Sequence, residues 1–491
     1  MTIKMITTIL PKKFGGRTTS LLERARLLNS ANVDIQIITS DYNPNYSSLY
    51  QKFYDDGRVL KNTSFLNLYD YFAEKLAGNA TVSWKTYLQN MLPDPFETYI
   101  EITDPKNKAI QFYFKDGIPA FRVNKDKSGN IKYFTLYQLG TMKTNVFFFV
   151  KNNEFVNRID YTDADDNVIK RQYLTNDATL YHTKITNADG KALKFELLDG
   201  DKLVTFKTQK KLITYFYKQV LDESDVVISD ARYVDRPLLD TNVKKRIFQL
   251  HSVHLEDPLG ASLEIKRSFK TVLESDLLGV DDIIVTLTDE QKRDILQVRP
   301  SLANNITVIP HSTPKRTITY DKLGKHFVMV LRLTEAKNIP DAIKAFSIFH
   351  KTHPDYIFDI YGDGELESQL RKLIKDEGLT NSVILQGRTD DIEKAYQTSD
   401  ALLVTSFYEG FGLNVLESIS NGTPVITYPI KYGPADIIDA NSGIVAEERT
   451  PESLANAMET FINSDFDQQK ILQRSEYFSQ ELFIKRWMEI L

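Results

Sequence analysis

Short apolar runs alternate with helical patterns near the start of the chain and again after its middle. We expect a strand over residues 3–9, a helix over residues 18–28 and a second strand over residues 34–39. A strand, a helix and a strand in this order predict the opening of a parallel α/β domain. The same texture returns later, with strands expected over residues 225–229, 246–251, 282–288 and 305–310.

Regular alternation of strands and helices also marks the second half of the chain. Strands are expected over residues 327–331, 356–361, 383–385, 401–404 and 424–428. Helices are expected between them, over residues 339–352, 365–376, 392–398 and 413–421. This alternation predicts a second doubly wound parallel sheet, and ligands of such sheets bind at the carboxyl ends of the strands. We therefore expect the site in a cleft between two α/β domains.

The stretch between residues 98 and 208 has a different texture, in which aromatic and polar residues alternate. Turn signals such as Asp116-Gly117 and Asp189-Gly190 separate the alternating runs. Period-two runs with Asx-Gly turns between them predict antiparallel hairpins. We therefore expect a β-rich insertion of about a hundred residues, which is large enough for a domain.

Together these patterns predict an α/β fold, in which two doubly wound, Rossmann-like domains face each other across a cleft and the first carries the antiparallel insertion. The expected amino-terminal domain comprises residues 1–97 and 209–313, with the insertion at residues 98–208. The carboxyl-terminal domain is expected over residues 314–475. Residues 476–491 are expected to form a helix that packs back on the amino-terminal domain.

The composition is ordinary for a globular chain of 491 residues, with 42% hydrophobic and 26% charged residues. The formal net charge of −5 gives no positive field for nucleic acid, so we expect no nucleic-acid partner. The absence of cysteine excludes disulfides, thiol nucleophiles and cysteine-bound metals. Residues 1–10 are short and interrupted by Lys4, unlike a signal peptide. We expect a cytoplasmic protein, with peripheral contact to the inner membrane face left open.

The segment from Thr405 to Glu417 carries the strongest chemical signal. A buried strand is expected before it, two glycines open the backbone, and a helix begins near residue 413. Free N–H groups at such a helix start bind phosphate. We predict ligand contacts along the whole turn, from Gly410, Phe411, Gly412, Leu413, Asn414, Val415 and Leu416. Glu409 and Glu417 are expected to bind hydroxyl groups of a phosphorylated sugar.

Two cations follow a predicted strand of the same domain. Arg332 offers a planar fork and Lys337 a point charge, a pair that suits a diphosphate. Gly15-Gly16 lies between the first strand and the first helix, where it lets a phosphate approach the helix start or forms a tight turn without a ligand.

Histidines and a basic cluster complete the candidate residues. His251 ends a predicted strand and is expected to face the cleft, and His254 is a second candidate three residues later. No third ligand lies at metal-site spacing, so we predict no metal site. The run Lys244, Lys245 and Arg246 could hold a polyphosphate acceptor together with His254.

These residues resemble glycosyltransferase family 4, whose fold is GT-B. The block from Glu409 to Glu417 is similar to the Glu-x7-Glu signature of that family, and Arg332 and Lys337 match its diphosphate-binding cations. Gly15-Gly16 matches its amino-terminal glycine loop. One departure is Leu331, where the family often has glycine before the arginine.

The resemblance implies a metal-independent enzyme that uses a UDP-sugar and retains the anomeric configuration. Arg332 and Lys337 would stabilise the leaving diphosphate, and Glu417 would bind the ribose. Glu409 and, from the opposite domain, His251 would contact the transferred sugar. Further donor contacts are assigned to Gly15, Gly16, Gly387 and Arg388.

The insertion resembles that of a Gram-positive subgroup, which comprises wall teichoic acid α-glycosyltransferases and the catalytic subunits that glycosylate serine-rich adhesins. This implies a polyanionic teichoic acid acceptor and a homo-oligomer, with a trimer possible, formed through the insertion. We expect transfer of a hexose, with glucose favoured, to poly(glycerol phosphate). Transfer of N-acetylglucosamine to poly(ribitol phosphate) or to Ser/Thr of an adhesin stays open. A non-catalytic co-activator ranks last. Such a relative would be expected to lose catalytic positions, whereas the charged residues Arg332, Lys337, Glu409 and Glu417 are all present.

Overall fold

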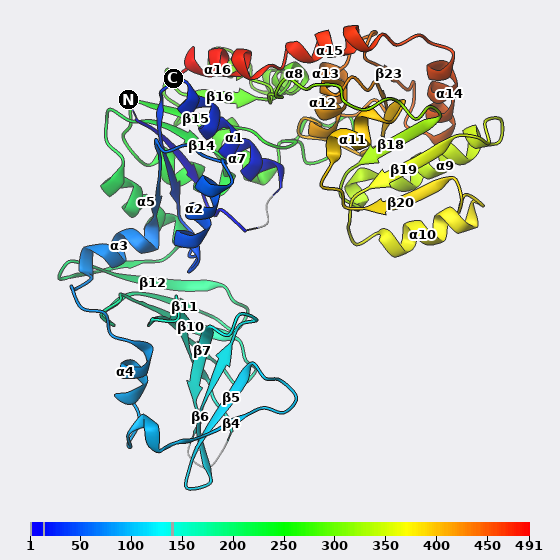
Figure 1. Ribbon diagram of the computed structural model, residues 1–491. Coiled ribbons are helices and arrows are strands. Elements are labelled where there is room, and N and C mark those ends of the chain that lie inside the picture. The colour runs from blue at the N-terminus through cyan, green and yellow to red at the C-terminus, as the bar shows by residue number, and fades with distance from the viewer. Residues whose placement is uncertain (1, 13–14, 139–141) are drawn as a thin grey trace.

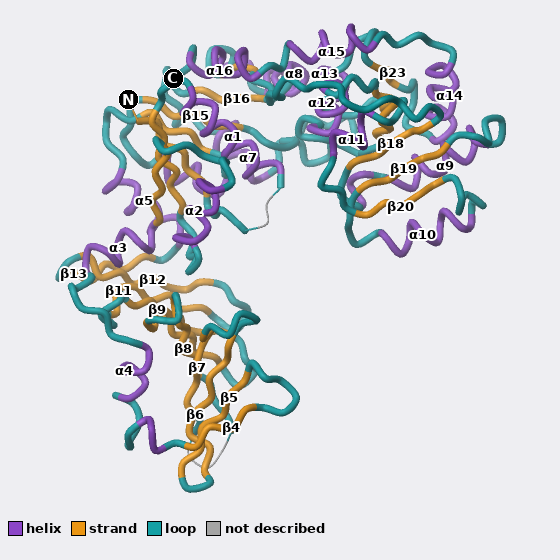
Figure 2. The backbone as a smooth tube through the Cα atoms, viewed as in Figure 1, coloured by secondary structure: helices purple, strands orange, loops and turns teal. Residues whose placement is uncertain are grey.

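The computed structural model describes residues 2–12, 15–138 and 142–491, and it arranges the chain around three sheets (Figure 1). Two sheets are parallel and belong to α/β domains, and the third is an antiparallel sheet that extends from the first domain. The tube view separates the helix-covered sheets from the almost entirely β insertion (Figure 2). The predicted α/β fold class with an antiparallel insertion is confirmed.

The amino-terminal sheet has the order β17-β16-β15-β14-β1-β2-β3, and neighbouring strands run parallel. Its strands are β1 (Thr2–Thr7), β2 (Asp34–Thr39), β3 (Thr63–Asn67), β14 (Val226–Ser229), β15 (Lys245–Gln249), β16 (Ile283–Thr286) and β17 (Ile306–Val308). Every residue of β14 is buried. Continuous burial is typical of a parallel strand with helices on both faces of its sheet.

Helices cover both faces of this sheet. They are α1 (Gly16–Ser30), α2 (Tyr46–Asp55), α3 (Leu68–Leu76), α5 (Gln209–Val220), α6 (Asp235–Leu239), α7 (Arg267–Leu273) and α8 (Asp289–Val298), with 3-10 turns η2 (Arg232–Val234) and η3 (Pro300–Leu302). Helix α1 packs Leu21 and Leu28 into one hydrophobic cluster, whereas α5 packs Leu212 and Phe216 into another. The sheet lies between these two cores.

The insertion is a ten-stranded antiparallel sheet in which the strands follow one another in chain order. They are β4 (Ile100–Thr103), β5 (Ile110–Lys115), β6 (Ile118–Lys125), β7 (Ile131–Leu136), β8 (Val146–Lys151), β9 (Phe155–Thr162), β10 (Val168–Leu174), β11 (Leu180–Thr186), β12 (Ala192–Asp199) and β13 (Lys202–Phe206), preceded by α4 (Trp84–Gln89) and η1 (Phe96–Thr98). Asp116 and Gly117 have φ values of 50° and 77°, as a two-residue hairpin turn requires. Strands β11 and β12 pack against α3, and β4 lies at the far end (Figure 1).

The carboxyl-terminal sheet has the order β20-β19-β18-β21-β22-β23. Its strands are β18 (His326–Val330), β19 (Ile357–Tyr361), β20 (Val383–Gly387), β21 (Ala401–Val404), β22 (Val425–Thr427) and β23 (Gly443–Val445). Its helices are α9 (Ile339–His350), α10 (Glu367–Asp376), α11 (Ile392–Gln397), α12 (Leu413–Ser420), α13 (Pro434–Ile437), α14 (Pro451–Ile462) and α15 (Gln468–Glu476), with the 3-10 turn η4 (Glu335–Lys337). These elements enclose one apolar core.

The last helix, α16 (Gln480–Met488), leaves the carboxyl-terminal domain and packs against α1 of the amino-terminal domain. Phe483 and Trp487 are buried in the core around α1. Both chain termini lie at this end of the molecule (Figure 1). Within the described ranges, no helix combines the length and the apolar character that a bilayer crossing needs.

Candidate active site

The loops that follow β18 and β21 leave the carboxyl-terminal sheet side by side, because these two strands are neighbours. The backbone N–H of Phe407 donates to the carbonyl oxygen of Ala336 at 3.0 Å. The Thr405 hydroxyl donates to the carbonyl oxygens of Lys337 at 3.2 Å and Asn338 at 2.9 Å. The fold therefore joins two segments that lie about 70 positions apart in the sequence.

This joining brings Lys337 and Glu409 into contact. Lys337 Nζ donates to Glu409 Oε1 at 2.5 Å, and the Ser406 hydroxyl donates to the same oxygen at 2.7 Å. The two charged side chains are only 20% and 12% exposed. Arg332 follows β18 with an exposed side chain. The site thus combines one paired cation, one exposed cation and a carboxylate at the carboxyl end of the sheet.

The turn before α12 is built around two glycines. Gly412 has a φ of 93° and forms the N-cap of α12, where it offers no side chain to cap the helix. The N–H of Val415 donates to the carbonyl oxygen of Gly412 at 3.0 Å and to Asn414 Oδ1 at 3.1 Å, so the amides of Leu413 and Asn414 are the ones placed to donate to an anion. A Cβ atom at Gly433 would lie 1.6 Å from the carbonyl oxygen of Phe411, so the close packing of residue 433 against the turn requires a glycine. Gly433 was not among the residues predicted from the sequence, although its position directly before Pro434, at the start of α13, is a signal for a turn.

Glu417 lies on α12 one turn inside the helix and is largely buried. The Tyr396 hydroxyl of α11 donates to Glu417 Oε2 at 3.0 Å. Burial raises the pKa of Glu417, and the Tyr396 hydrogen bond and the charge of Arg316 oppose that rise. Asn414 on the same helix has a buried side-chain amide nitrogen without a hydrogen-bond partner in the described part of the chain.

The two α/β domains meet at this turn. A Cβ atom at Gly410 would lie 2.3 Å from the carbonyl oxygen of His251, so only a glycine permits this approach. A Cβ atom at Gly16 would lie 3.8 Å from Leu413 Cδ1. The structure therefore brings the predicted glycine loop, the predicted histidine and the predicted helix start together across the domain boundary.

A cleft of about 860 Å³ opens beside this contact. Three of the predicted site residues line the cleft, namely Leu413, Leu416 and Glu417. Ser20 and His311 line it from the amino-terminal domain. Arg332, Lys337, Glu409 and His251 do not line this cleft. The cleft therefore lies beside the face of α12 that carries Glu417, and not beside the two cations Arg332 and Lys337.

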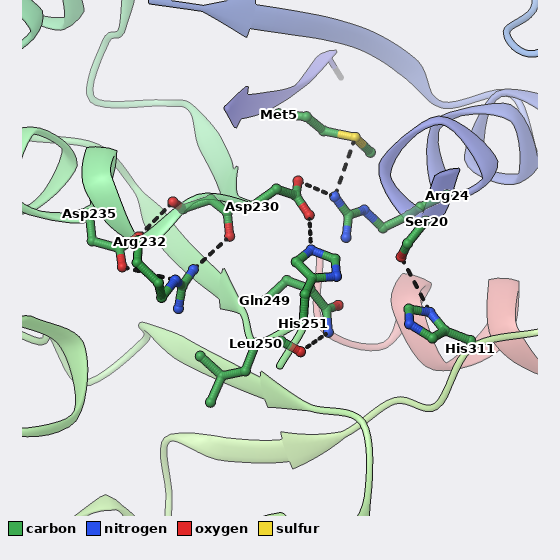
Figure 3. A network of polar contacts seen from close by, with 11 residues as sticks. Met5, Ser20, Arg24, Asp230, Arg232, Asp235, Gln249, Leu250, His251 and His311 are labelled. Atoms are coloured by element: carbon green, nitrogen blue, oxygen red, sulfur yellow. Dashed lines mark hydrogen bonds and ion pairs between the residues drawn. The ribbon is translucent and has the colours of Figure 1, made fainter. Parts of the chain in front are cut away.

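His251 lies in the loop two residues beyond the end of β15, and not at the strand end as predicted. Its Nε2 is 2.7 Å from Oδ1 of the buried Asp230, which follows the neighbouring strand β14 (Figure 3). Arg24 of α1 forms an ion pair with the second oxygen of Asp230. Burial would raise the pKa of Asp230, but the charge of Arg24 and the hydrogen bond with His251 outweigh that effect and lower the pKa.

Burial lowers the pKa of His251, and Asp230 offsets part of that change. His311 lies with its ring centroid 6.3 Å from that of His251 and 5.1 Å from that of Phe411. Burial lowers the pKa of His311 to about 3. The histidines of this region are therefore neutral at pH 7. Asp230, Arg24 and His311 were not among the residues predicted from the sequence, although Asp230, like His251, lies just beyond the carboxyl end of a parallel strand.

The structure does not support the predicted acceptor role of His254. The His254 ring is fully buried and stacks at 5.8 Å on Tyr432 of the other domain. The Tyr432 hydroxyl donates to Asp294 Oδ2 at 2.8 Å, and Lys431 Nζ lies 2.8 Å from the same oxygen. His254 thus belongs to the contact between the domains, where a polymer cannot reach it.

The basic run at the start of β15 also lies outside the site. Because β15 runs parallel to its neighbours, its first residues are at the edge of the sheet opposite to His251. Lys245 donates to the carbonyl oxygen of Ile490 at 2.9 Å, and Arg246 pairs with Asp282 at 2.9 Å. Lys244 is exposed at the same edge. These three residues therefore lie at the edge of the sheet away from His251 and the domain contact, and their binding of the acceptor stays a prediction.

Gly387 and Arg388 lie at the carboxyl end of β20, the edge of the sheet that also carries Arg332. The Gly387 carbonyl oxygen accepts from the Gly362 N–H at 2.8 Å, and the exposed Arg388 lies 3.5 Å from Asp363. Among residues 2–12, 15–138 and 142–491, no three acidic or histidine side chains gather as a metal site would require.

Residues 316–477 match the family described as "Glycosyl transferases group 1". The carboxyl-terminal domain is a glycosyltransferase group 1 domain, a domain of sugar-transferring enzymes, and the chain has the GT-B fold.

Individual relatives span nearly the whole chain. The poly(ribitol-phosphate) alpha-N-acetylglucosaminyltransferase of Staphylococcus aureus is 25% identical over 97% of this chain and 96% of that protein. The poly(glycerol-phosphate) alpha-glucosyltransferase of Bacillus subtilis is 24% identical over 97% of this chain and 73% of that protein. The crystal structure of S. aureus TarM (G117R mutant) in complex with fondaparinux, alpha-GlcNAc-glycerol and UDP superposes with a TM-score of 0.84 at 24% identity, covering 100% of this chain and 99% of that one.

Proposed function

We propose that this protein is a UDP-sugar-dependent, retaining glycosyltransferase that adds a hexose in α-linkage to a polyol-phosphate polymer. The observation that carries the proposal is the contact of Lys337 with Glu409 next to the uncapped start of α12. Two relatives whose similarity extends over 97% of this chain are named as α-glycosyltransferases of such polymers. We place the activity in the cytoplasm, with contact to the inner membrane face as part of the proposal.

In this mechanism the diphosphate of the donor meets Arg332, Lys337 and the amides at the start of α12. These groups stabilise the negative charge that develops as the sugar leaves, which is an electrostatic role. The proposal includes no metal ion, because the two cations and the helix start supply the positive charge. Glu417 accepts hydrogen bonds from the ribose, and Glu409 and His251 bind the transferred sugar. Gly15, Gly16, Gly387 and Arg388 complete the donor contacts.

The chemistry needs no covalent enzyme intermediate. The acceptor hydroxyl attacks from the face that the diphosphate leaves, and its proton passes to the departing phosphate oxygen. A new C–O bond to the acceptor forms as the C–O bond to the diphosphate breaks, so UDP and the α-linked product result. The carboxylate of Glu409 is held by Lys337 and Ser406, which places it to bind hydroxyl groups rather than to attack.

For the substrates we propose glucose and poly(glycerol phosphate). The second candidate is N-acetylglucosamine on poly(ribitol phosphate), which the S. aureus relative favours because its similarity extends over 96% of that protein. We further propose a homo-oligomer formed through the insertion. Its edge strand β4 is exposed along its whole length, and an unpaired exposed strand edge can pair with another chain.

Replacement of Lys337 by Ala tests the proposed site. The variant should keep its fold and lose turnover by on the order of 10²–10³-fold, because one charge that stabilises the leaving group is gone. Release of UDP from UDP-glucose and from UDP-N-acetylglucosamine gives the rate, and circular dichroism gives the fold. Normal UDP release by a folded K337A protein would contradict the assignment.

A further inference from the structure

Asp230 and His251 lie just beyond the carboxyl ends of two neighbouring strands, β14 and β15. Strands β14 and β15 pair in parallel, so the residues just beyond their carboxyl ends lie at the same edge of the sheet, where Gly410 of the other domain approaches His251. His251 Nε2 lies 2.7 Å from Asp230 Oδ1, whereas the buried Nδ1 has no hydrogen-bond partner in the described part of the chain. Figure 3 shows the His251 ring with Nε2 turned to Asp230. The ring therefore has one satisfied nitrogen and one that is left for a ligand.

Arg24 holds Asp230 from the opposite side. It lies at a buried position of α1, between the core residues Leu21 and Leu28, and its guanidinium pairs with Asp230 Oδ2. An arginine stays charged at any accessible pH, so it keeps a buried carboxylate ionised. An ionised carboxylate can only accept hydrogen bonds. The Asp230 side chain therefore requires a proton on Nε2 of His251 and leaves the lone pair on Nδ1.

Trp487 of the last helix fixes Arg24. The guanidinium carbon of Arg24 lies 4.7 Å from the centroid of the Trp487 ring, and the ring is fully buried. Gln480 at the start of α16 donates to Glu23 at 2.8 Å, which anchors the helix to α1 beside Arg24. The aromatic face stabilises the cation without competing for Asp230.

The same carboxyl-terminal segment also reaches the donor side of the cleft. Helix α15 packs against α12, which carries Glu417 and the amide turn, and α16 follows α15 after three residues. The N–H of Thr313 donates to the carbonyl oxygen of Phe478 between them at 2.9 Å. The carboxyl-terminal segment thus makes both contacts: α15 packs against α12, which carries Glu417, and α16 contacts Arg24 through Trp487.

We propose that Arg24, held by Trp487, is a positioning residue that fixes His251 as the tautomer with hydrogen on Nε2. Nδ1 then accepts a hydrogen bond from a hydroxyl group of the transferred sugar. The identity of that ligand rests on the proposed function, but the tautomer does not. Neither Arg24 nor Trp487 touches the substrate in this account.

The tautomer of His251 is read by NMR of protein with ¹⁵N-labelled histidine, without any sugar nucleotide. His251→Gln identifies the signal. Wild-type protein should show hydrogen on Nε2 only, and Arg24→Met should give a mixed or doubly protonated ring with an acid limb of turnover at higher pH. The acid limb moves to higher pH because loss of the nearby positive charge of Arg24 makes proton uptake by the Asp230–His251 pair easier. Turnover should fall on the order of 10²-fold, as a misplaced contact group implies.

Two further variants separate positioning from stability. Arg24→Lys keeps the charge and should restore the Nε2–H tautomer and most of the turnover, even where Arg24→Met fails to fold. Arg236→Met removes an exposed arginine of α6 that pairs with Asp240, and it should change neither readout. The inference is overturned if folded Arg24→Met protein keeps the hydrogen on Nε2 of His251. It is also overturned if Arg24→Lys protein no longer shows the hydrogen on Nε2. Lack of sugar transfer by the wild type overturns the proposed function alone.

Discussion

Gly410 of the carboxyl-terminal domain lies directly against the backbone of His251 in the amino-terminal domain. A Cβ atom at Gly410 would come within 2.3 Å of the His251 carbonyl oxygen and 3.0 Å of Ser252 Cα. Backbone atoms cannot move aside as a flexible side chain can. This contact therefore sets how closely the turn before α12 and His251 approach each other.

Gly410→Ala should separate the two domains without unfolding either. The added methyl group requires a backbone shift, and misplacement by about 1 Å costs on the order of 10²-fold in rate. Steady-state UDP release measures kcat/KM, and thermal unfolding measures stability. Normal kcat/KM in a folded Gly410→Ala protein would show that the contact is not part of the working geometry.

Glu417→Gln should weaken UDP binding about tenfold, or about 1.4 kcal/mol, because the amide accepts hydrogen bonds from the ribose less strongly than a carboxylate. Isothermal titration of UDP at pH 7 measures the change. Tyr396→Phe is the matched control, since it removes the hydroxyl that donates to Glu417 and keeps the carboxylate. A larger loss in Tyr396→Phe than in Glu417→Gln would argue against direct contact of Glu417 with the ribose.

The UDP affinity should also depend on pH through Glu417. Burial raises the pKa of this carboxyl, so it gains a proton at a higher pH than an exposed glutamate does. UDP binding should therefore weaken earlier on acidification than for an exposed carboxylate, and Glu417→Gln should remove that part of the pH dependence. Equal pH profiles for the two proteins would contradict the assignment.

His254 should make the folded protein sensitive to mild acid. Burial lowers the pKa of His254 to about 4, with Asp294 opposing the change and Lys431 and Lys266 adding to it. A folded-state pKa below the unfolded value near 6.5 means that its stabilising contribution is complete above about pH 6.5 and is lost as pH falls towards 4. Urea unfolding between pH 7 and 5 should show a decline in stability that is shallower in His254→Phe. Identical slopes would refute the role of His254.

The edge of the insertion should control self-association. Ile100 and Ile102 point to one face of β4 and are 66% and 51% exposed, at the end of the sheet far from the α/β domains. The double change to Lys should shift sedimentation velocity to a smaller species without loss of fold. Leu203→Lys on the other edge strand, β13, is the control because that edge lies beside α5. An oligomer that persists in the double variant would contradict assembly through β4.

The order of strands and helices could be predicted because each α/β unit has its own local pattern. The strand over residues 34–39 and the strand over residues 401–404 have the predicted bounds, since buried runs end sharply at polar residues. The turn before α12 could also be predicted, because strand, glycines and helix are contiguous in sequence. The GT-B fold followed from the family resemblance that these residues carry.

The Arg24–Asp230–His251 arrangement could not be predicted from local pattern alone, because Arg24 and Asp230 are 206 positions apart. One signal was available: an arginine at a core position of the predicted helix over residues 18–28 needs a buried acidic partner. The place of the basic run at Lys244 could not be predicted either, because charge density does not show at which end of a strand the ligand binds. Strand direction in the parallel sheet decides that question.

The proposed activity itself is measured by transfer of labelled sugar to a defined polymer. Purified protein is incubated with labelled UDP-glucose or UDP-N-acetylglucosamine and with poly(glycerol phosphate) or poly(ribitol phosphate), with Lys337→Ala in parallel. We predict that the wild type incorporates sugar in α-linkage into one of these polymers, with glucose on poly(glycerol phosphate) preferred, and that Lys337→Ala does not. Folded wild-type protein that labels neither polymer from either donor would contradict the account.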